Sequence, residues 1–148
     1  MKLLVCLLMA LGFALSAARL AHARNVELLI PIADAMAATG LRDGPTGAVK
    51  FFFATQQSPK ILKNLGSYLA APRTGAMGLY DQRACHEAFL WTLVDLEKRA
   101  QRAGANAVVN IVSYYRKKER ASITDFECHV GNVIATVWLK GDLVNIAE

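Results

Sequence analysis

The sequence lacks the short motifs that identify many nucleotide-binding, zinc-binding and serine-dependent proteins. Its nearest glycine pair, Gly44-Pro45-Thr46-Gly47, is not followed by the Lys-Ser/Thr that a phosphate-binding loop needs, which excludes an ATPase of that type. There is no CxxC pair to hold zinc, and no GxSxG nucleophile elbow around Ser67, Ser113 or Ser122. Catalysis is therefore the weaker interpretation, with a small hydrolase as its remaining form.

The sequence also lacks a run of apolar residues long enough to span a membrane as a helix. The run from Leu3 to Leu15 falls short of the roughly 20 residues that a spanning helix requires. It follows the basic Met1-Lys2 and precedes Ala21-His22-Ala23, an A-x-A cleavage pattern. We predict a signal peptide, residues 1–23, cleaved after Ala23, and an uncut N-terminal anchor is the alternative. Cys6 lies too near the start of the run for a lipidation site.

Removing residues 1–23 from the 148 leaves 125 residues, enough for one domain over 24–148. Lys2 and Arg19 leave with the leader, so 15 of the 17 basic residues remain against 12 acidic ones, a net charge of about +3. The one dense basic run, 116–120, is interpreted as a solvated hairpin tip. We therefore expect no nucleic-acid partner, and contact with nucleic acid or anionic lipid is the alternative.

Cysteine is scarce, and cleavage would remove one of the three. Cys85 and Cys128 remain, and two cysteines in an exported chain usually pair because the compartment is oxidising. We predict a Cys85–Cys128 disulfide and a periplasmic or secreted location, with two buried, unpaired thiols as the alternative.

Residues 82–103 form the clearest predicted element, an amphipathic helix. Apolar side chains recur at helical spacing and give one buried stripe that includes Cys85 and Phe89. Asp81 is the expected N-cap, and Gly104 follows the last periodic residue, where a left-handed conformation ends many helices. Asn106 is the next residue expected to take a positive φ.

Beyond Asn106 the apolar pattern changes to the two-residue period of strands. Residues 107–114 are apolar on both faces and predict a central strand, in which Asn110 is expected to be a satisfied polar residue near the sheet end. Residues 123–129 alternate, with Cys128 on one face and Glu127 and His129 on the other. A third strand is expected over 133–139, closed by Lys140-Gly141-Asp142.

Upstream of the helix the pattern is weaker. Residues 48–56 predict a strand that is either internal to the sheet or an oligomer contact, and Pro31 begins a short helix that ends near Gly40. Residues 57–80 show no periodicity and are interpreted as a long irregular loop, a kind of segment that is often functional. The predicted fold class is α+β. One long amphipathic helix packs on a small, mostly antiparallel sheet in the order β-α-β-β-β, stapled by one disulfide, with 82–148 as its core.

Three stretches, "VKFFFATQQSP", "GANAVVNIVSYY" and "ECHVGNVIATVWLKG", resemble a family of short exported bacterial proteins of undefined function. Its members often carry the label "excinuclease ATPase subunit", which the missing phosphate loop contradicts. The order of helix, GANAV, strand and hairpin is more distantly similar to YbjQ-like proteins, described as heavy-metal-binding, and to RcsF-like envelope domains. That likeness of layout implies a fold and, only through analogy, a role.

Two histidines flank the cysteines and suggest a metal site. His86 with Glu87, and Glu127 with His129, would share one neighbourhood if the disulfide forms. Imidazole and carboxylate ligands suit Zn or Cu. The alternative is that the histidines are exposed and unrelated, because His129 should leave the strand on the face opposite Cys128. Asp125 and Glu127 share a strand face and could serve acid–base chemistry, although such pairs are usually solvated.

The leading hypothesis is a non-catalytic exported binding or interaction module of the bacterial envelope, whose partner is an envelope protein or a small ligand. Its binding surface is expected at 57–80 and at the sheet edge, and self-association into a homo-oligomer is a further alternative. A Zn- or Cu-binding envelope protein is the second hypothesis. No cofactor is otherwise expected, and no membrane-spanning segment should remain after cleavage.

Overall fold

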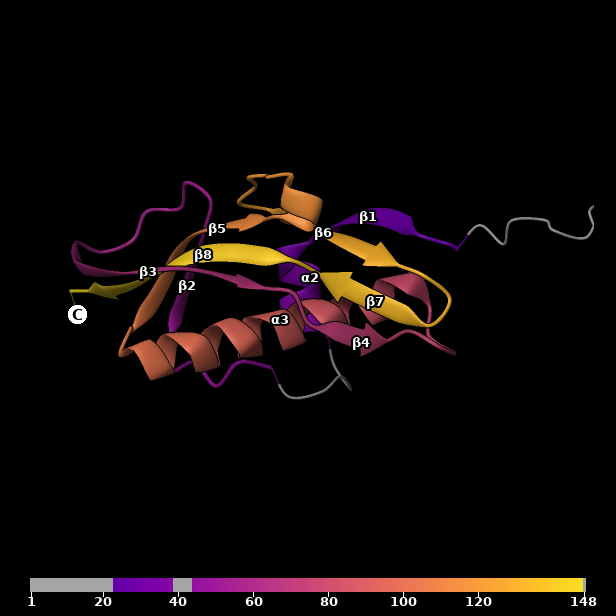
Figure 1. Cartoon of the computed structure of the whole chain (residues 1–148), viewed down its shortest axis with the longest axis horizontal. Helices are drawn as coiled ribbons and strands as arrows, with labels where there is room; N and C mark the ends of the chain where they lie inside the picture. Colours follow the sequence, from indigo (N-terminus) through magenta and orange to yellow (C-terminus); the bar gives the residue numbers. More distant parts are fainter. Residues whose placement is uncertain (1–22, 39–43, 148) are drawn as a thin grey trace, which may run out of the picture.

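The computed structural model describes residues 23–38 and 44–147 (Figure 1). Apart from Ala23, the predicted signal peptide lies outside these residues, and its cleavage stays a prediction; Gly40, the expected end of the first helix, also lies outside them. The elements in chain order are β1 Val26–Pro31, α2 Ile32–Ala37, β2 Lys50–Phe53, β3 Ile61–Ala70, β4 Arg73–Gly75, α3 Asp81–Ala103, β5 Ala107–Ser113, the 3-10 turn η1 Tyr115–Lys117, β6 Asp125–Val130, β7 Ile134–Val137 and β8 Leu139–Ile146.

The α+β fold class is confirmed, but the described residues form two four-stranded sheets instead of one small sheet. The first has the order β1-β6-β7-β4 and is antiparallel throughout. The second has the order β2-β5-β8-β3, and only its β2–β5 pair is parallel. Trp138 alone separates β7 from β8, so the chain passes directly from one sheet to the other.

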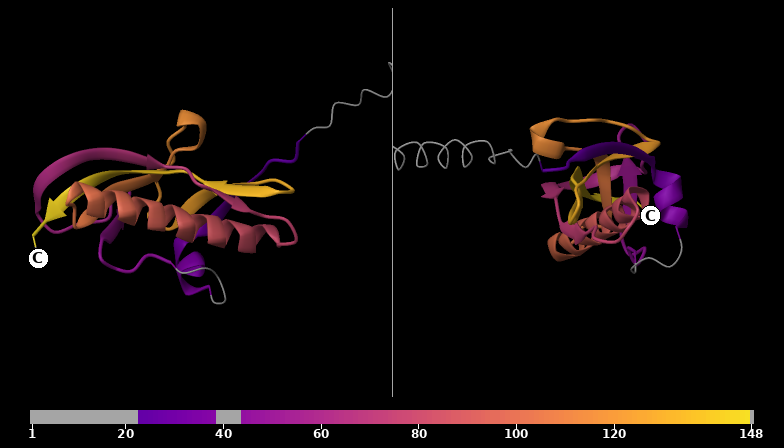
Figure 2. Two further views of the ribbon diagram at one scale, coloured as in Figure 1. Left: turned by 60° about the horizontal axis from the view of Figure 1, so that its bottom comes forward. Right: turned by 90° about the vertical axis from the view of Figure 1, so that its right-hand side faces the viewer.

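Helix α3 runs along one side of both sheets, as Figure 2 shows. Its apolar stripe is buried there, and Phe89 is the centre of an aromatic stack with Phe126 at 4.1 Å and Phe53 at 6.1 Å between ring centroids. Burying one large apolar side chain stabilises a fold by about 1.5–3 kcal/mol, so this stripe is a main source of stability.

At the two ends of α3, one prediction is confirmed and two are wrong. Gly104 has φ 74° and its amide bonds to the Gln101 carbonyl, which is the expected left-handed helix stop. Asp81 is not the N-cap: Tyr80 precedes the helix without a side-chain cap, and Asp81 is the first helical residue. Asn106 does not take a positive φ; its side chain instead bonds both the amide and the carbonyl of Ile146.

Strand β5 is central, as predicted, and lies between β2 and β8. Asn110 has φ 53° and marks a break in the β5–β8 register. Its side-chain amide donates to Asp142 Oδ2 at 2.9 Å, so it is a satisfied polar residue as expected. Asn110 lies within β5, whereas the prediction placed it near the end of the sheet. The sequence did not indicate this position, since a β-bulge does not change the apolar alternation in a recognisable way.

The irregular loop predicted over 57–80 is wrong, because β3 and β4 occupy most of it. Strand β3 is an exposed edge strand, and its pairing with β8 shifts register between Asn64 and Ser67, around Gly66 at φ 102°. A strand that is exposed on both faces does not need alternating apolar and polar residues, and the bulge shifts the alternation by one residue. The sequence of β3 therefore shows no two-residue period.

The prediction that Lys140-Gly141-Asp142 closes the strand over 133–139 is also wrong, since β8 continues through these residues. A Cβ at Gly141 would lie 2.6 Å from Val108 Cγ1 and 3.1 Å from Ile111 Cγ1. Glycine is required here because β8 and β5 approach closely, which a sequence does not distinguish from a turn.

The strand expected over 48–56 is shorter and lies at a sheet edge. β2 pairs only with β5, and in parallel, so the interpretation as an internal strand is wrong. The three phenylalanines of β2 pack through contacts other than a second neighbouring strand. Phe51 and Phe53 pack into the core under α3, whereas Phe52 packs with a small cluster on the opposite face of the sheet.

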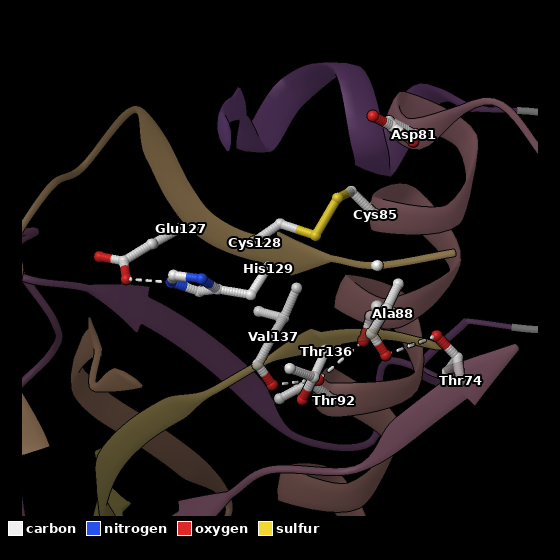
Figure 3. Close-up of a disulfide and its surroundings, with 12 residues drawn as sticks. Thr74, Asp81, Cys85, Ala88, Thr92, Glu127, Cys128, His129, Thr136 and Val137 are labelled. Carbon is white, nitrogen blue, oxygen red and sulfur yellow. Dashed lines mark hydrogen bonds and ion pairs between the residues drawn. A yellow bond between two sulfur atoms is a disulfide. The ribbon is translucent and has the colours of Figure 1, made fainter. Parts of the chain in front are cut away.

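The predicted disulfide is confirmed. Cys85 in the first turns of α3 bonds Cys128 of β6, with 5.8 Å between their Cα atoms (Figure 3). Both residues are fully buried, so the bond ties the helix to the first sheet from inside the core.

Removing the disulfide should lower the free energy of unfolding by about 4 kcal/mol, because 43 residues separate the cysteines and the unfolded chain gains that loop's freedom. Urea denaturation of Cys85→Ala/Cys128→Ala against the oxidised wild type measures the loss. Alkylation of unreduced wild type without residues 1–23, which therefore lacks Cys6, should add no alkyl group, and two adducts would contradict the bond.

Candidate functional site

A polar cleft of about 510 Å³ lies on the face of the first sheet that points away from α3. Strands β1 and β6 form its floor, and the segment that carries η1 forms its wall. Its lining side chains are mostly charged: Asn25, Glu27, Tyr115, Arg116, Lys118, Glu119, Arg120, Glu127 and His129.

The floor is a buried pair of side chains from β6. His129 and Glu127 are each 7% exposed, and His129 Nε2 lies 2.7 Å from Glu127 Oε1. Strand alternation places them opposite Cys128, as Figure 3 shows: the disulfide faces the helix and the pair faces outward. The Glu127 amide donates to Ser113 Oγ at 2.9 Å, which fastens this position of β6 to the end of β5.

Arg120 closes the charge network. Its Nε donates to Glu127 Oε2 and its Nη2 donates to Glu27 Oε1, each at 3.1 Å. Its backbone is held by a reciprocal pair of hydrogen bonds with Ser113, at 2.9 and 3.0 Å. A carboxylate as buried as Glu127 is costly unless a cation and hydrogen bonds compensate it, so Arg120 is a structural requirement of the floor.

Tyr115 covers His129. Their rings are stacked, with centroids 3.4 Å apart and planes 15° apart, and Trp138 meets Tyr115 edge-on at 5.3 Å. The Arg116 guanidinium lies 5.3 Å from the centroid of the same ring. His129 is thereby enclosed by aromatic contact on one side and by Glu127 at its edge.

Most of the described non-glycine residues with a positive φ line this cleft or a second one. The second cleft, about 280 Å³, is lined by Ala54 and Asn110 among others, and Glu119 lines both. In the described part of the chain, the non-glycine residues with positive φ are Ala54, Asn110, Arg116 and Lys117. Three of the four line one of the clefts, and Lys117 follows directly on Arg116. Such conformations cost about 1–3 kcal/mol each and are enriched at functional sites.

The structure brings together only half of the predicted metal ligands. Glu127 and His129 form a group with Glu27, in which one potential ligand atom from each lies within 4.8 Å of the others. His86 and Glu87 are outside this group: both lie on α3, and Glu87 is near Arg83 Nε at 3.7 Å. The disulfide does not bring His86 near His129. Adjacent strand residues point to opposite faces, so Cys128 faces α3 and His129 faces away from it.

Glu27 and Arg120 were missed by sequence reasoning. Glu27 reaches the site because β1 pairs antiparallel with β6, with Glu27 directly opposite His129. That pairing joins residues about 100 positions apart and leaves no local signal. Arg120 was assigned to a solvated hairpin tip, and its role depends on the isolated bridge to Ser113.

The serines and the glycine pair have structural partners. Ser67 donates to Asp142, Ser113 accepts from Glu127, and Ser122 bonds Thr124; in the described chain none of these hydroxyls bonds a histidine. The amides of Thr46 and Gly47 donate to the buried Glu97 carboxylate at 2.9 and 3.1 Å. These two amides are therefore already bonded to a carboxylate of the protein, and a strand, not a helix, follows them.

Searches against models of known families, curated proteins and solved structures found no match for this chain. Across 23–38 and 44–147, no helix is both long and apolar enough to cross a bilayer. The function is therefore argued from the geometry of the cleft.

His86 should make stability depend on pH. Burial lowers the pKa of His86 below its usual 6.5, opposed by nearby Asp34, and its Nε2 is buried without a partner among the described residues. The unfolded chain therefore takes up the proton first as pH falls. The stabilisation is complete above the unfolded pKa and is lost as pH falls through the lower folded pKa.

Urea denaturation from about pH 7.5 to about pH 5 should show a steeper loss of stability in wild type than in His86→Gln. His129 is present in both proteins, so the difference between the two curves isolates His86. Parallel curves would contradict the prediction.

Proposed function

We propose that this protein is a non-catalytic, exported binding module of the bacterial envelope, and that its ligand site is the polar cleft between β1, β6 and the 114–121 segment. The leader pattern of residues 1–23 and the disulfide support an oxidising, extracytoplasmic location. The cleft replaces 57–80 as the proposed binding surface, because β3 and β4 use that segment for sheet pairing.

The observation that carries the proposal is a pair of opposite charges at the rim of the cleft. Lys118 and Glu119 line it, and neither has an ion-pair partner among the described residues. Below them Arg120 pairs with the carboxylates of Glu27 and Glu127, and Nδ1 of His129 is buried without a hydrogen-bond partner among the described residues. A floor whose carboxylates are already paired, under free charges of both signs, suits a small polar ligand that carries both signs, such as a short peptide.

Geometry disfavours catalysis at this site. The buried imidazole of His129 is stacked under Tyr115 and bonded to the buried Glu127 carboxylate, and no serine hydroxyl reaches the imidazole in the described chain. A nucleophile must lie within hydrogen-bond reach of its base, so a hydrolase has no support from this arrangement.

Native mass spectrometry of the protein purified from its own envelope tests the proposal. Wild type should carry an additional small mass, and Lys118→Ala/Glu119→Ala should lose it because the rim charges are removed. Lys63→Ala, an exposed lysine on β3, is the matched control and should keep the mass. An additional mass that persists in the rim variant, or no additional mass on wild type, would count against the proposal.

A metal site is the second candidate, because Glu27, Glu127 and His129 already offer three ligand atoms within 4.8 Å. Carboxylate oxygen and imidazole nitrogen suit Zn or Cu. The Arg120 guanidinium holds both carboxylates, so a cation would have to displace it. Competition between Arg120 and a metal is the distinctive feature of this candidate.

Calorimetric titration of the whole exported protein with Zn²⁺ should show one site that is lost in His129→Asn and kept in His86→Asn. Arg120→Ala should bind about tenfold more tightly, because the competing positive charge is gone. Circular dichroism checks that each variant is folded. Equal binding by wild type and His129→Asn, or no binding to any variant, would remove the metal candidate.

A further inference from the structure

One end of the molecule carries a group of exposed apolar side chains. The loop between β4 and α3 presents Met77 and Tyr80, which are 73% and 88% exposed. The turn between β6 and β7 presents Val133, which is 53% exposed, and the first residue of β7, Ile134, is 42% exposed. Both loops lie at the right-hand end in Figure 1, and we call these four residues the apolar tip.

The two loops form one surface. The Ala76 amide donates to the Val133 carbonyl at 2.8 Å, and Gly75 pairs with Ile134 in the β4–β7 ladder. Gly78, with φ 76°, turns the first loop back toward α3. The apolar tip is therefore held in place by backbone hydrogen bonds on both sides, and its exposure is built into the fold.

The N-terminal leader joins the domain at this same end. The Arg24 side chain pairs with Asp81 at the start of α3 and donates to the Gly131 carbonyl at 3.4 Å. Arg24 is only nine positions after Leu15, the last residue of the apolar run, a span of at most about 30 Å. While that run is in a bilayer, Arg24 and the apolar tip beside it are tethered within about 30 Å of the end of the run.

The composition of the tip fits lipid better than protein. Four side chains at the tips of two loops are far fewer than the roughly 20–30 residues per partner of a stable protein interface. Tyrosine favours the boundary between hydrocarbon and water, since its ring is apolar and its hydroxyl is polar. Arg24 and Arg83 flank the tip but pair with Asp81 and Glu87, so apolar contact must dominate over attraction to anionic lipid.

We propose that the apolar tip docks the domain on a lipid bilayer by shallow insertion of Met77, Tyr80 and Val133. This inference is independent of the ligand cleft and survives if the cleft binds nothing. It also sets an orientation: the end of α3 that carries the disulfide lies toward the membrane, and the C-terminal end of β8 lies away from it (Figures 1 and 2).

Flotation with lipid vesicles tests the proposal on the exported protein, once mass measurement shows that its N-terminus is Arg24. Wild type should float with vesicles of phosphatidylethanolamine and phosphatidylglycerol, and also with phosphatidylcholine alone, because its binding is apolar. The bound fraction should change little at high salt.

Met77→Ser/Tyr80→Ser/Val133→Ser should reduce the bound fraction by at least about tenfold. Ile61→Ser/Leu62→Ser is the matched control, with exposed apolar residues of β3 at the opposite end, and should float like wild type. Urea denaturation confirms that both variants are folded.

Three results would overturn the proposal. The first is a wild type that does not float, and the second is a tip variant that floats as well as wild type. The third is a dimer in size-exclusion chromatography that the tip variant alone disrupts, which would assign the tip to a second copy of this chain.

Discussion

The packing of α3 against both sheets is the contact on which the remaining architecture depends. Phe89 lies between Phe53 of the second sheet and Phe126 of the first, so one helix side chain joins the two cores. The disulfide from Cys85 then attaches β6 to the same helix. Because the two sheets share a helix and are joined in sequence through Trp138, neither sheet can move without disturbing the other.

This arrangement also determines which side of β6 can bind a ligand. Phe126, Cys128 and Val130 are committed to the core, and strand alternation then sends Glu127 and His129 to the outer face. A buried carboxylate on that face requires a cation, and Arg120 supplies it from the segment that follows β5. The same segment brings Tyr115 over His129. The cleft is therefore a consequence of how β6 is held from behind.

The molecule has a polar cleft on one face and exposed apolar side chains at one end, and we propose a different contact for each. The cleft lies over β1 and β6, while the apolar tip extends from the ends of β4 and β6 beside Arg24. If the tip rests on a bilayer, the cleft opens along the side of the domain and stays accessible to a ligand from solution. Binding at the cleft and docking at the tip can then occur together.

The sequence by itself determined the elements whose pattern is local: the helix over 82–103, its stop at Gly104, the central strand that begins at Ala107, and the pairing of Cys85 with Cys128. These follow from side-chain periodicity, the conformational freedom of glycine and the usual pairing of two cysteines in a chain expected to be exported. Tertiary structure alone decided that β3 is a strand, because a bulge and edge exposure erase its period, and that Gly141 marks a close approach. It also brought Glu27 opposite His129 and Arg120 onto Glu127. Strand pairings between distant residues leave no trace in local sequence, and the candidate site is built from such pairings.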